Sequence, residues 1–360
     1  MDDTKYWVAF SRIPAIGRAR IERLERHFGV LEEAWAAGSF ELRAAGLEEK
    51  LVGAIVEQRR AISPDAELDR VQRLGIEALT WNDPRYPPRL KQIDERPPVL
   101  YVRGTLEEKD EWSVGIVGTR RATTYGRQAA ETIAGDLARQ QITIISGLAR
   151  GIDTVAHQAA LAAGGRTIAV LPCPVDRVYP TQNAGLAQSI REHGALVSEY
   201  PPDMPILRDF FWRRNRIVAG MTLGVLVVEA GETSGALVTA KNAADENREV
   251  FAVPGSIFSP YSRGTNELIQ SGAKLVRNAR DVLVELNLTM VSEQVAVQQA
   301  LPADETELAL LNCLSAEPCH IDEIGRQAGL APSAVSSALA LLELKGLVRQ
   351  VGGLNFIRLH

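Results

Sequence analysis

Arginines and aromatic residues are interleaved in one short segment, residues 208–216, in a pattern that suits a nucleic-acid strand. Phosphate groups favour arginine, whose guanidinium is permanently charged and binds two phosphate oxygens at once. Unstacked bases favour aromatic faces, and each stacking contact contributes about 1–3 kcal/mol. Three consecutive aromatics cannot all face one groove, and we expect Phe211 to be the one that contacts a base. The polar residues expected at the same surface are Arg208, Arg213, Arg214, Asn215 and Arg216.

Two glycine-containing turns add a second kind of phosphate site. The first, residues 115–120, follows an apolar run that begins at Ser113, and the second, residues 146–153, follows the apolar run 142–145. Each leads into a predicted helix, and the unpartnered N–H groups and dipole of a helix N-terminus attract anions. Ligands of open α/β sheets bind outside the carboxyl ends of the strands, so both turns should face one crevice. The residues expected to hold phosphate there are Gly118, Thr119, Arg120, Ser146, Gly147 and Arg150.

The spacing of these turns argues against a bound dinucleotide. The G-x-G-x-x-G fingerprint is absent after Ser113, and the next predicted strand closes on Ser146 instead of an acidic residue that could hold a ribose. Arg120, at the mouth of the first turn, favours a phosphate presented from outside the crevice. A third turn, residues 229–236, opens a helix, and we expect Ser234 and Lys241 to form a further wall of the same site.

Two enzymatic interpretations stand beside binding. Ser146, Asp153 and His157 could form a hydrolytic triad, but no G-x-S-x-G elbow occurs in the sequence, and Asp153 suits the first turn of a helix. The stronger alternative is a nucleotide-processing enzyme, such as a phosphoribohydrolase, which would also use glycine turns for phosphate. It would need an acid beside the phosphate, and Glu199 and Glu229 are the candidates. We expect Glu229 to be structural and the protein to have no catalytic residues.

The elements that position these residues alternate between predicted strands and helices. Most of the strands are continuous apolar runs, which is typical of strands buried on both faces of a parallel sheet. This order predicts an α/β, Rossmann-like, doubly wound and mostly parallel sheet. The predicted strands are 99–102, 114–117, 143–145, 167–171, 196–198, 225–228 and 250–253, and the predicted helices include 125–139, 154–162 and 237–247.

Flanking segments predict two further domains. Residues 1–65 contain short helical patterns with tight turns at Gly17 and Gly46, which indicates a helix-hairpin-helix or SAM-like domain. Whether its hairpins bind DNA stays open, because the second carries two glutamates. Residues 66–287 form the extended Rossmann-like domain, and residues 288–303 read as a linker. Residues 304–360 predict three helices and then two strands, which is the order of a winged helix.

The charge distribution restricts which domain could bind nucleic acid. The formal net charge of −5 argues against a uniformly basic surface but allows a local basic groove. Residues 303–360 hold seven acidic residues and four Lys or Arg, a formal charge of −3, whereas DNA readers need a positive footprint. The predicted third helix, residues 332–345, carries one cation and no side chain suited to a bidentate base contact. We favour a protein-contact or regulatory role for this domain.

Cysteine content and hydropathy indicate the compartment. Cys173, Cys313 and Cys319 cannot all be paired within the chain, which fits a reducing environment. The spacing of Cys313, Cys319 and His320 matches no zinc pattern, so we expect no metal, and we expect no cofactor. No segment reaches the roughly 18 uninterrupted apolar residues of a membrane span, and the first residues do not form a signal peptide. We therefore expect a cytoplasmic protein without a membrane partner.

Five ordered blocks of sequence resemble the DNA-processing protein A family, also called DprA or Smf. The resemblance covers nearly the whole chain, because the helical and winged-helix regions also resemble flanking domains of that family. Any one block would be weak, but five in this order and spacing are specific. The blocks are VGTR at 117–120 with YG at 125–126, SGLARGID at 146–153 with AH at 156–157, RNRIVAG at 214–220, SGALVTA at 234–240, and VPG at 253–255 with GTN at 264–266.

The resemblance implies a non-enzymatic protein that binds single-stranded DNA in a basic pocket of its Rossmann-like domain. It also implies a homodimer that protects incoming single strands and loads the RecA recombinase onto them during natural transformation. By position, Arg120 matches the phosphate-binding arginine, Arg208 a basic pocket residue and Phe211 the base contact. Trp212 stands where the family would have a small residue or proline, which leaves open which aromatic enters the pocket.

The resemblance also points to a dimerisation segment. Residues 265–276 resemble the region that the family uses for dimerisation, and within them Leu268 and Ile269 are the apolar residues we expect at the interface.

Overall fold

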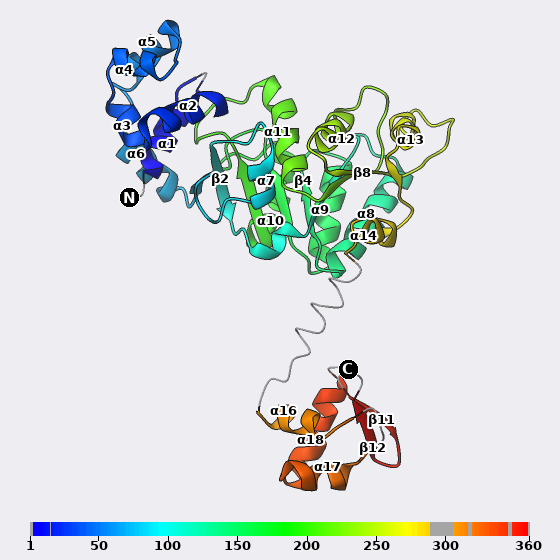
Figure 1. The fold of residues 1–360 in the computed structure, drawn as a ribbon. Helices are drawn as coiled ribbons and strands as arrows, with labels where there is room; N and C mark the ends of the chain where they lie inside the picture. Colours follow the sequence, from blue (N-terminus) through cyan, green and yellow to red (C-terminus); the bar gives the residue numbers. More distant parts are fainter. Residues whose placement is uncertain (1–2, 15, 289–304, 316–318, 345–347, 359–360) are drawn as a thin grey trace. The chain divides into compact units, whose positions relative to one another are not determined.

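The computed structural model describes residues 3–14, 16–288, 305–315, 319–344 and 348–358, which form two compact units, Met1–Leu286 and Asn287–His360 (Figure 1). Nearly all of the predicted linker, residues 289–303, lies outside the described residues. The first unit contains the predicted helical and Rossmann-like regions, and the second contains the predicted winged helix.

A nine-stranded sheet forms the centre of the first unit, in the order β1-β2-β6-β5-β4-β3-β7-β8-β9. The strands from β3 onward all pair in parallel, while β2 is antiparallel to β6 and β1 is antiparallel to β2. The seven predicted strands are confirmed, whereas β1 and β9 were not predicted. The strands are β1 Glu77–Thr80, β2 Val99–Gly104, β3 Ser113–Val117, β4 Thr143–Ser146, β5 Thr167–Val170, β6 Gly194–Ser198, β7 Gly224–Val227, β8 Glu249–Ala252 and β9 Lys274–Leu275.

The strand order reverses beside β3, and this reversal places the ligand crevice. The chain moves from β3 through β4 and β5 to β6 on one side, then returns to add β7 on the other side of β3. Connections leave β3 and β7 in opposite directions, so a crevice opens between them at their carboxyl ends. The predicted turns after β3 and β4 and the third turn after β7 all lie at this edge of the sheet.

Helices cover the sheet in two layers, as a doubly wound fold requires. Helices α8, α9 and α10 connect the strands from β3 to β6, and α9 packs against both α8 and α10; α11 packs against α12 in the second layer. Figure 1 shows α11 and α12 side by side over the sheet. The helices are α7 Pro88–Gln92, α8 Thr124–Arg139, α9 Ile152–Ala162, α10 Ala184–His193, α11 Arg208–Gly220, α12 Gly235–Asp245, α13 Arg263–Gln270 and α14 Ala279–Glu285.

The N-terminal region is helical as predicted, but it does not end at residue 65. Helix α6 continues to Arg73 and packs on α1, and the buried side chains of both regions form one apolar cluster. The rings of Trp7 and Trp81 meet edge to face, 5.3 Å apart, across that boundary. The helices are α1 Thr4–Ser11, α2 Arg18–Phe28, α3 Leu31–Ala36, α4 Ser39–Ala44, α5 Glu49–Gln58 and α6 Pro64–Arg73.

The second unit has the predicted winged-helix order. Helices α16 Glu305–Asn312, α17 Ile321–Ala328 and α18 Pro332–Leu344 precede the hairpin of β11 Val348–Gly352 and β12 Asn355–Arg358. A short strand, β10 Cys319–His320, adds to this hairpin. Gly329 ends α17 in the left-handed conformation, which makes the turn between the two helices. The three cysteines of the chain are free, and among the described residues no cluster of side chains could hold a metal ion.

None of the helices within the described residues combines the length and apolar character needed to cross a bilayer.

Candidate nucleic-acid interface

Helix α11 separates the three consecutive aromatics of residues 210–212 onto different faces, because successive side chains on an α-helix point about 100° apart. Phe210 is buried and its ring stacks on Tyr200, with centroids 3.7 Å apart. Phe211 is half-buried, and Trp212 is 53% exposed. Two of the three aromatics are therefore available at the surface, and Phe210 belongs to the core.

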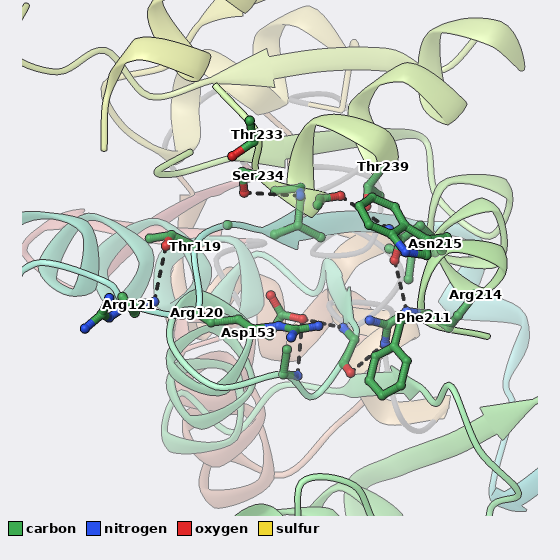
Figure 2. A pocket seen from close by; sticks show the side chains of 18 residues that line it. Thr119, Arg120, Arg121, Asp153, Phe211, Arg214, Asn215, Thr233, Ser234 and Thr239 are labelled. Atoms are coloured by element: carbon green, nitrogen blue, oxygen red, sulfur yellow. Dashed lines mark hydrogen bonds between the residues drawn. The ribbon is translucent and has the colours of Figure 1, made fainter. Parts of the chain in front are cut away.

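Phe211 and Trp212 line a cavity of about 380 Å³ at the carboxyl ends of β3, β4 and β7, which we call the first cavity. Figure 2 shows that its walls come from the loop after β3, the loop after β4, helix α11 and the turn that opens α12. Its apolar surface is framed by hydroxyl and guanidinium groups. Eight of the predicted site residues lie in this wall: Gly118, Thr119, Arg120, Gly147, Phe211, Arg214, Asn215 and Ser234.

Arg120 and Arg121 both line this cavity, and Arg120 contacts its aromatic wall. The guanidinium carbon of Arg120 lies 5.6 Å from the centroid of the Phe211 ring, in cation–π contact. No carboxylate among the described residues forms an ion pair with Arg120 or with its exposed neighbour Arg121. Both guanidiniums therefore retain the charge and the donors that a phosphate needs.

The second turn carries its own anion, which changes how it can act. The Asp153 carboxylate accepts hydrogen bonds from the backbone N–H groups of Gly147, at 3.1 Å, and Ala149, at 3.3 Å. Burial raises the pKa of Asp153, and the positive charge of Arg214 opposes that rise. The prediction that Gly147 offers its amide to a phosphate is therefore wrong, because a carboxylate of the chain already occupies that position.

Arg214 fixes the floor of the first cavity and is not a surface cation. Its guanidinium donates to the carbonyl oxygen of Gly147 at 2.5 Å and to that of Val170, and the side chain is only 6% exposed. Burial lowers the pKa of Arg214, which the charge of Asp153 partly offsets. A Cβ atom at position 147 would overlap this guanidinium, so the turn requires glycine there.

The first turn is held by Glu229, one of the two acids considered for catalysis. Its carboxylate accepts hydrogen bonds from the backbone N–H of Thr123, at 2.9 Å, and from the Thr123 hydroxyl, at 2.6 Å. Thr123 in turn caps α8 by accepting from the N–H of Gly126. A Cβ at Gly126 would overlap the carboxylate. The expectation that Glu229 is structural is thus confirmed, since it orders the start of α8 from a buried position.

A second cavity of about 250 Å³ adjoins the first, and Phe211 lines both. Its outer wall is the loop between β5 and α10, which contributes Pro172, Tyr179, Pro180, Thr181 and Gln182. The rings of Tyr179 and Phe211 meet edge to face at 5.3 Å. Arg150, predicted as a phosphate contact, lines this cavity and not the first one.

Five predicted site residues line neither cavity. Ser146 is fully buried and donates its hydroxyl to the carbonyl oxygen of Ile116 at 2.5 Å, so its side chain cannot reach a ligand. Arg216 forms a two-pronged ion pair with Glu199, at 2.9 and 2.8 Å, which neutralises its charge below the surface. The other three are exposed on helices away from the cavity walls: Arg208, Arg213 and Lys241. The helical geometry of α11 thus disperses the predicted arginine cluster.

The possible hydrolytic triad is not assembled. His157 Nδ1 lies 2.7 Å from the Thr167 hydroxyl, and its Nε2 has no hydrogen-bond partner within the described residues, so the ring links neither Asp153 nor Ser146. Burial and the nearby charge of Arg214 lower the pKa of His157 to about 3, which keeps the ring neutral. A general base needs a hydrogen bond to the nucleophile, which His157 does not make.

Several lining residues were not predicted. Thr233 and Thr239 line the first cavity, and Tyr179 and Gln182 line the second. Trp212, which the sequence left open as an alternative to Phe211, also lines the first cavity. The segment 179–183 follows the predicted strand 167–171 at a carboxyl end, so the rule that placed the other turns in the crevice could have pointed to it. Thr239 gave no such signal, because it lies inside a helix.

Comparison with known proteins settles the family. The sequence profile of DNA recombination-mediator protein A matches residues 77–287, and that of the DprA winged helix domain matches residues 294–353. The chain belongs to the DprA/Smf family. Protein Smf of Synechocystis is 35% identical to it over 390 aligned positions, which cover 98% of each chain. DprA of Streptococcus pneumoniae is 43% identical over 203 positions, covering 56% of this chain and 72% of that protein.

Two solved DprA structures share the fold. DprA of S. pneumoniae superimposes with a TM-score of 0.70 at 34% identity, covering 78% of this chain and 97% of that one. DprA of Helicobacter pylori gives a TM-score of 0.53 at 32% identity, covering 59% and 95% of the two chains, and its structure is described as revealing a single-stranded DNA binding mode. The α/β architecture predicted from the sequence is therefore confirmed.

Proposed function

We propose that this protein binds single-stranded DNA in the crevice at the carboxyl ends of β3, β4 and β7. The observation that carries the proposal is the pairing of a free guanidinium, Arg120, with the half-buried ring of Phe211 at the mouth of the first cavity. A phosphate suits the first and an unstacked base suits the second. A duplex would keep its bases stacked inside and could not offer them to the ring.

Membership of the DprA/Smf family extends the proposal beyond the site. We infer that the protein acts in natural transformation by covering incoming single strands and loading RecA recombinase onto them. We also infer a homodimer that uses helix α13, where Leu268 and Ile269 are half-buried. A dimer would place two crevices on one strand and raise its apparent affinity through effective concentration.

The rival, a nucleotide-processing enzyme, would need an available acid in the site. Asp153 lines the first cavity, but its carboxylate accepts hydrogen bonds from the backbone of Gly147 and Ala149. Glu199 is paired with Arg216, Glu229 holds Thr123 at the start of α8, and neither lines the first or the second cavity. We propose a binding protein without catalysis. Release of a free base from a nucleoside monophosphate, abolished in Glu229→Gln, would overturn that proposal.

The test compares single-stranded and double-stranded oligonucleotides by fluorescence anisotropy, for the wild type, Arg120→Glu and Arg280→Glu. Arg280 is an exposed arginine on α14 that lines neither cavity, so it supplies the same charge change elsewhere. We expect the wild type to prefer the single strand, Arg120→Glu to lose at least about tenfold in affinity, and Arg280→Glu to bind nearly as the wild type does. Affinity should fall with salt, with a slope of about −0.7 for each phosphate neutralised. Equal affinity for both forms of DNA, or equal binding by both variants, would contradict the proposal.

A further inference from the structure

The second cavity is built like a site for one planar ring. Its lining combines the rings of Tyr179, Phe211 and two prolines with the guanidiniums of three arginines, and Thr181 and Gln182 add polar side chains. Binding sites typically combine apolar walls with a few placed polar groups, and sites for drug-sized ligands occupy roughly 300–1,000 Å³. At about 250 Å³, this cavity suits a single base better than a whole nucleotide with its phosphate.

Hydrogen bonds of residues next to the lining segment fix the loop that forms the outer wall of the second cavity. Asn183, which follows the lining segment, is 8% exposed and donates through Nδ2 to the Leu148 carbonyl and the Thr154 hydroxyl, both at 2.9 Å. These contacts tie the outer wall to the turn after β4. At the start of the loop, Leu171 donates its N–H to Val197 at 2.8 Å. Such bracing reduces the ordering cost that a ligand must overcome.

Arg120 and Phe211 belong to both cavities, and this shared position gives them a joint role. Phe211 is the one aromatic side chain of the described residues that lines both cavities, whose common boundary also includes Gly147, Ala149 and Arg214. Arg120, in contact with the ring, stands at the same junction with no ion-pair partner among the described residues. A strand that places one base in each cavity would bring the connecting phosphate to this guanidinium.

We propose that the second cavity is a base-binding subsite, so that the unit bound by one crevice is a dinucleotide step with its bases on either side of Phe211. This rests on the proposed function, which concerns single-strand binding in the same crevice. Tyr179 is the contact specific to the second base and Trp212 the contact specific to the first, because each lines only one cavity. Gln182 at the rim can donate to or accept from the edge of the second base.

The experiment measures competition by dithymidylate against a labelled oligothymidylate, with the full chain. Two further competitors replace either thymine by an abasic residue, which keeps the charge unchanged. For the wild type, each replacement should weaken competition about five- to hundredfold, as expected for one lost stack. In Tyr179→Ala one of the two replacements should lose its effect, and in Trp212→Ala the other should, so that each variant is coupled to a different base.

Tyr125→Ala is the matched control, because Tyr125 is 50% exposed, like Tyr179 at 44%, and lines neither cavity. It should respond to both replacements as the wild type does. Coupling of Tyr179 and Trp212 to the same base, or of Tyr179 to neither, would overturn the second subsite while leaving single-strand binding intact. If the oligothymidylate itself does not bind, or binds Arg120→Glu as tightly as the wild type, the proposed function falls and the subsite with it.

Discussion

Asp153 and Arg120 have different electrostatic roles in the crevice, because Asp153 is buried at the floor of the cavity and Arg120 is exposed at its surface. Asp153 binds the backbone amides of the turn after β4 and offsets the charge of Arg214 beneath the cavity. The buried pair is internally neutralised and orders the floor. Arg120 is left as the exposed cation over Phe211. Affinity for phosphate therefore depends on the surface arginine, whereas removal of Asp153 would leave a buried charge uncompensated and destabilise the fold.

The buried His157 should make the stability of the protein depend on pH. Its pKa in the folded protein, about 3, lies below its ordinary value of 6.5, so only the unfolded chain takes up this proton in between. Stability should therefore fall as the pH drops from 6.5 towards 3, by about 1.4 kcal/mol per pH unit from this residue alone. His157→Asn keeps a donor to Thr167 but cannot titrate. Urea unfolding at several pH values should show a shallower fall for the variant, and identical slopes would refute the assignment.

At the scale of elements, helix α11 decides which side chains of the segment 208–216 reach the crevice. Its rotation sends Phe210 and Arg214 inward, pairs Arg216 with Glu199, and leaves Phe211, Trp212 and Asn215 at the cavity. The helix is anchored by these inward contacts, so its outward aromatics are presented on a fixed support. A loop with the same composition would not separate the side chains that face the crevice from those that face the core.

The contrast between two arginines of the crevice region tests this account. Arg216→Gln should destabilise the protein by about 1–3 kcal/mol, because it leaves the half-buried Glu199 carboxylate without its charged partner. Its affinity for single strands, measured below the melting temperature, should stay close to that of the wild type. Arg120→Glu should show the opposite pattern, with unchanged melting temperature and weakened binding. Loss of affinity in Arg216→Gln with unchanged stability would show that the ion pair opens to bind DNA.

The fold could be predicted from the sequence more completely than the residues of the site. Buried parallel strands such as β4 and β7 are apolar runs, and turn residues such as Gly118 mark their carboxyl ends, so local pattern sufficed. The prediction that the arginines of residues 208–216 share one surface rested on their closeness in the sequence alone. Their separation depends on the helical phase of α11 and on Glu199, which is distant in sequence. The self-occupied turn at Asp153 likewise follows from three-dimensional geometry that spacing does not reveal.

At the scale of the whole molecule, the two units differ in charge and in the sites that they contain. The crevice and its supports all lie within Met1–Leu286, which has its own continuous core. The winged-helix unit has a separate apolar core, and residues 303–360 carry a formal charge of −3. A negative surface weakens attraction to DNA. This division favours a protein-contact or regulatory role for the winged helix.

Truncation tests that division. A chain that ends at residue 290 keeps the buried Leu288 and loses the winged helix. Its affinity for single-stranded DNA should remain within about threefold of the full chain, because the removed segment contributes no net positive charge. Anisotropy titrations, with light scattering to monitor the oligomeric state, would measure this. A large loss of affinity at unchanged oligomeric state would assign DNA contacts to the winged helix.

The most direct test of the central claim is to locate the strand on the protein by photocrosslinking. An oligothymidylate that carries 5-iodouracil would be irradiated in complex with the full chain, and the crosslinked residues identified by mass spectrometry. Iodouracil reacts with aromatic side chains that stack on it, so we predict crosslinks at Phe211, with Trp212 and Tyr179 as neighbours in the two cavities. Crosslinks confined to the N-terminal helices or to the winged helix would contradict the account.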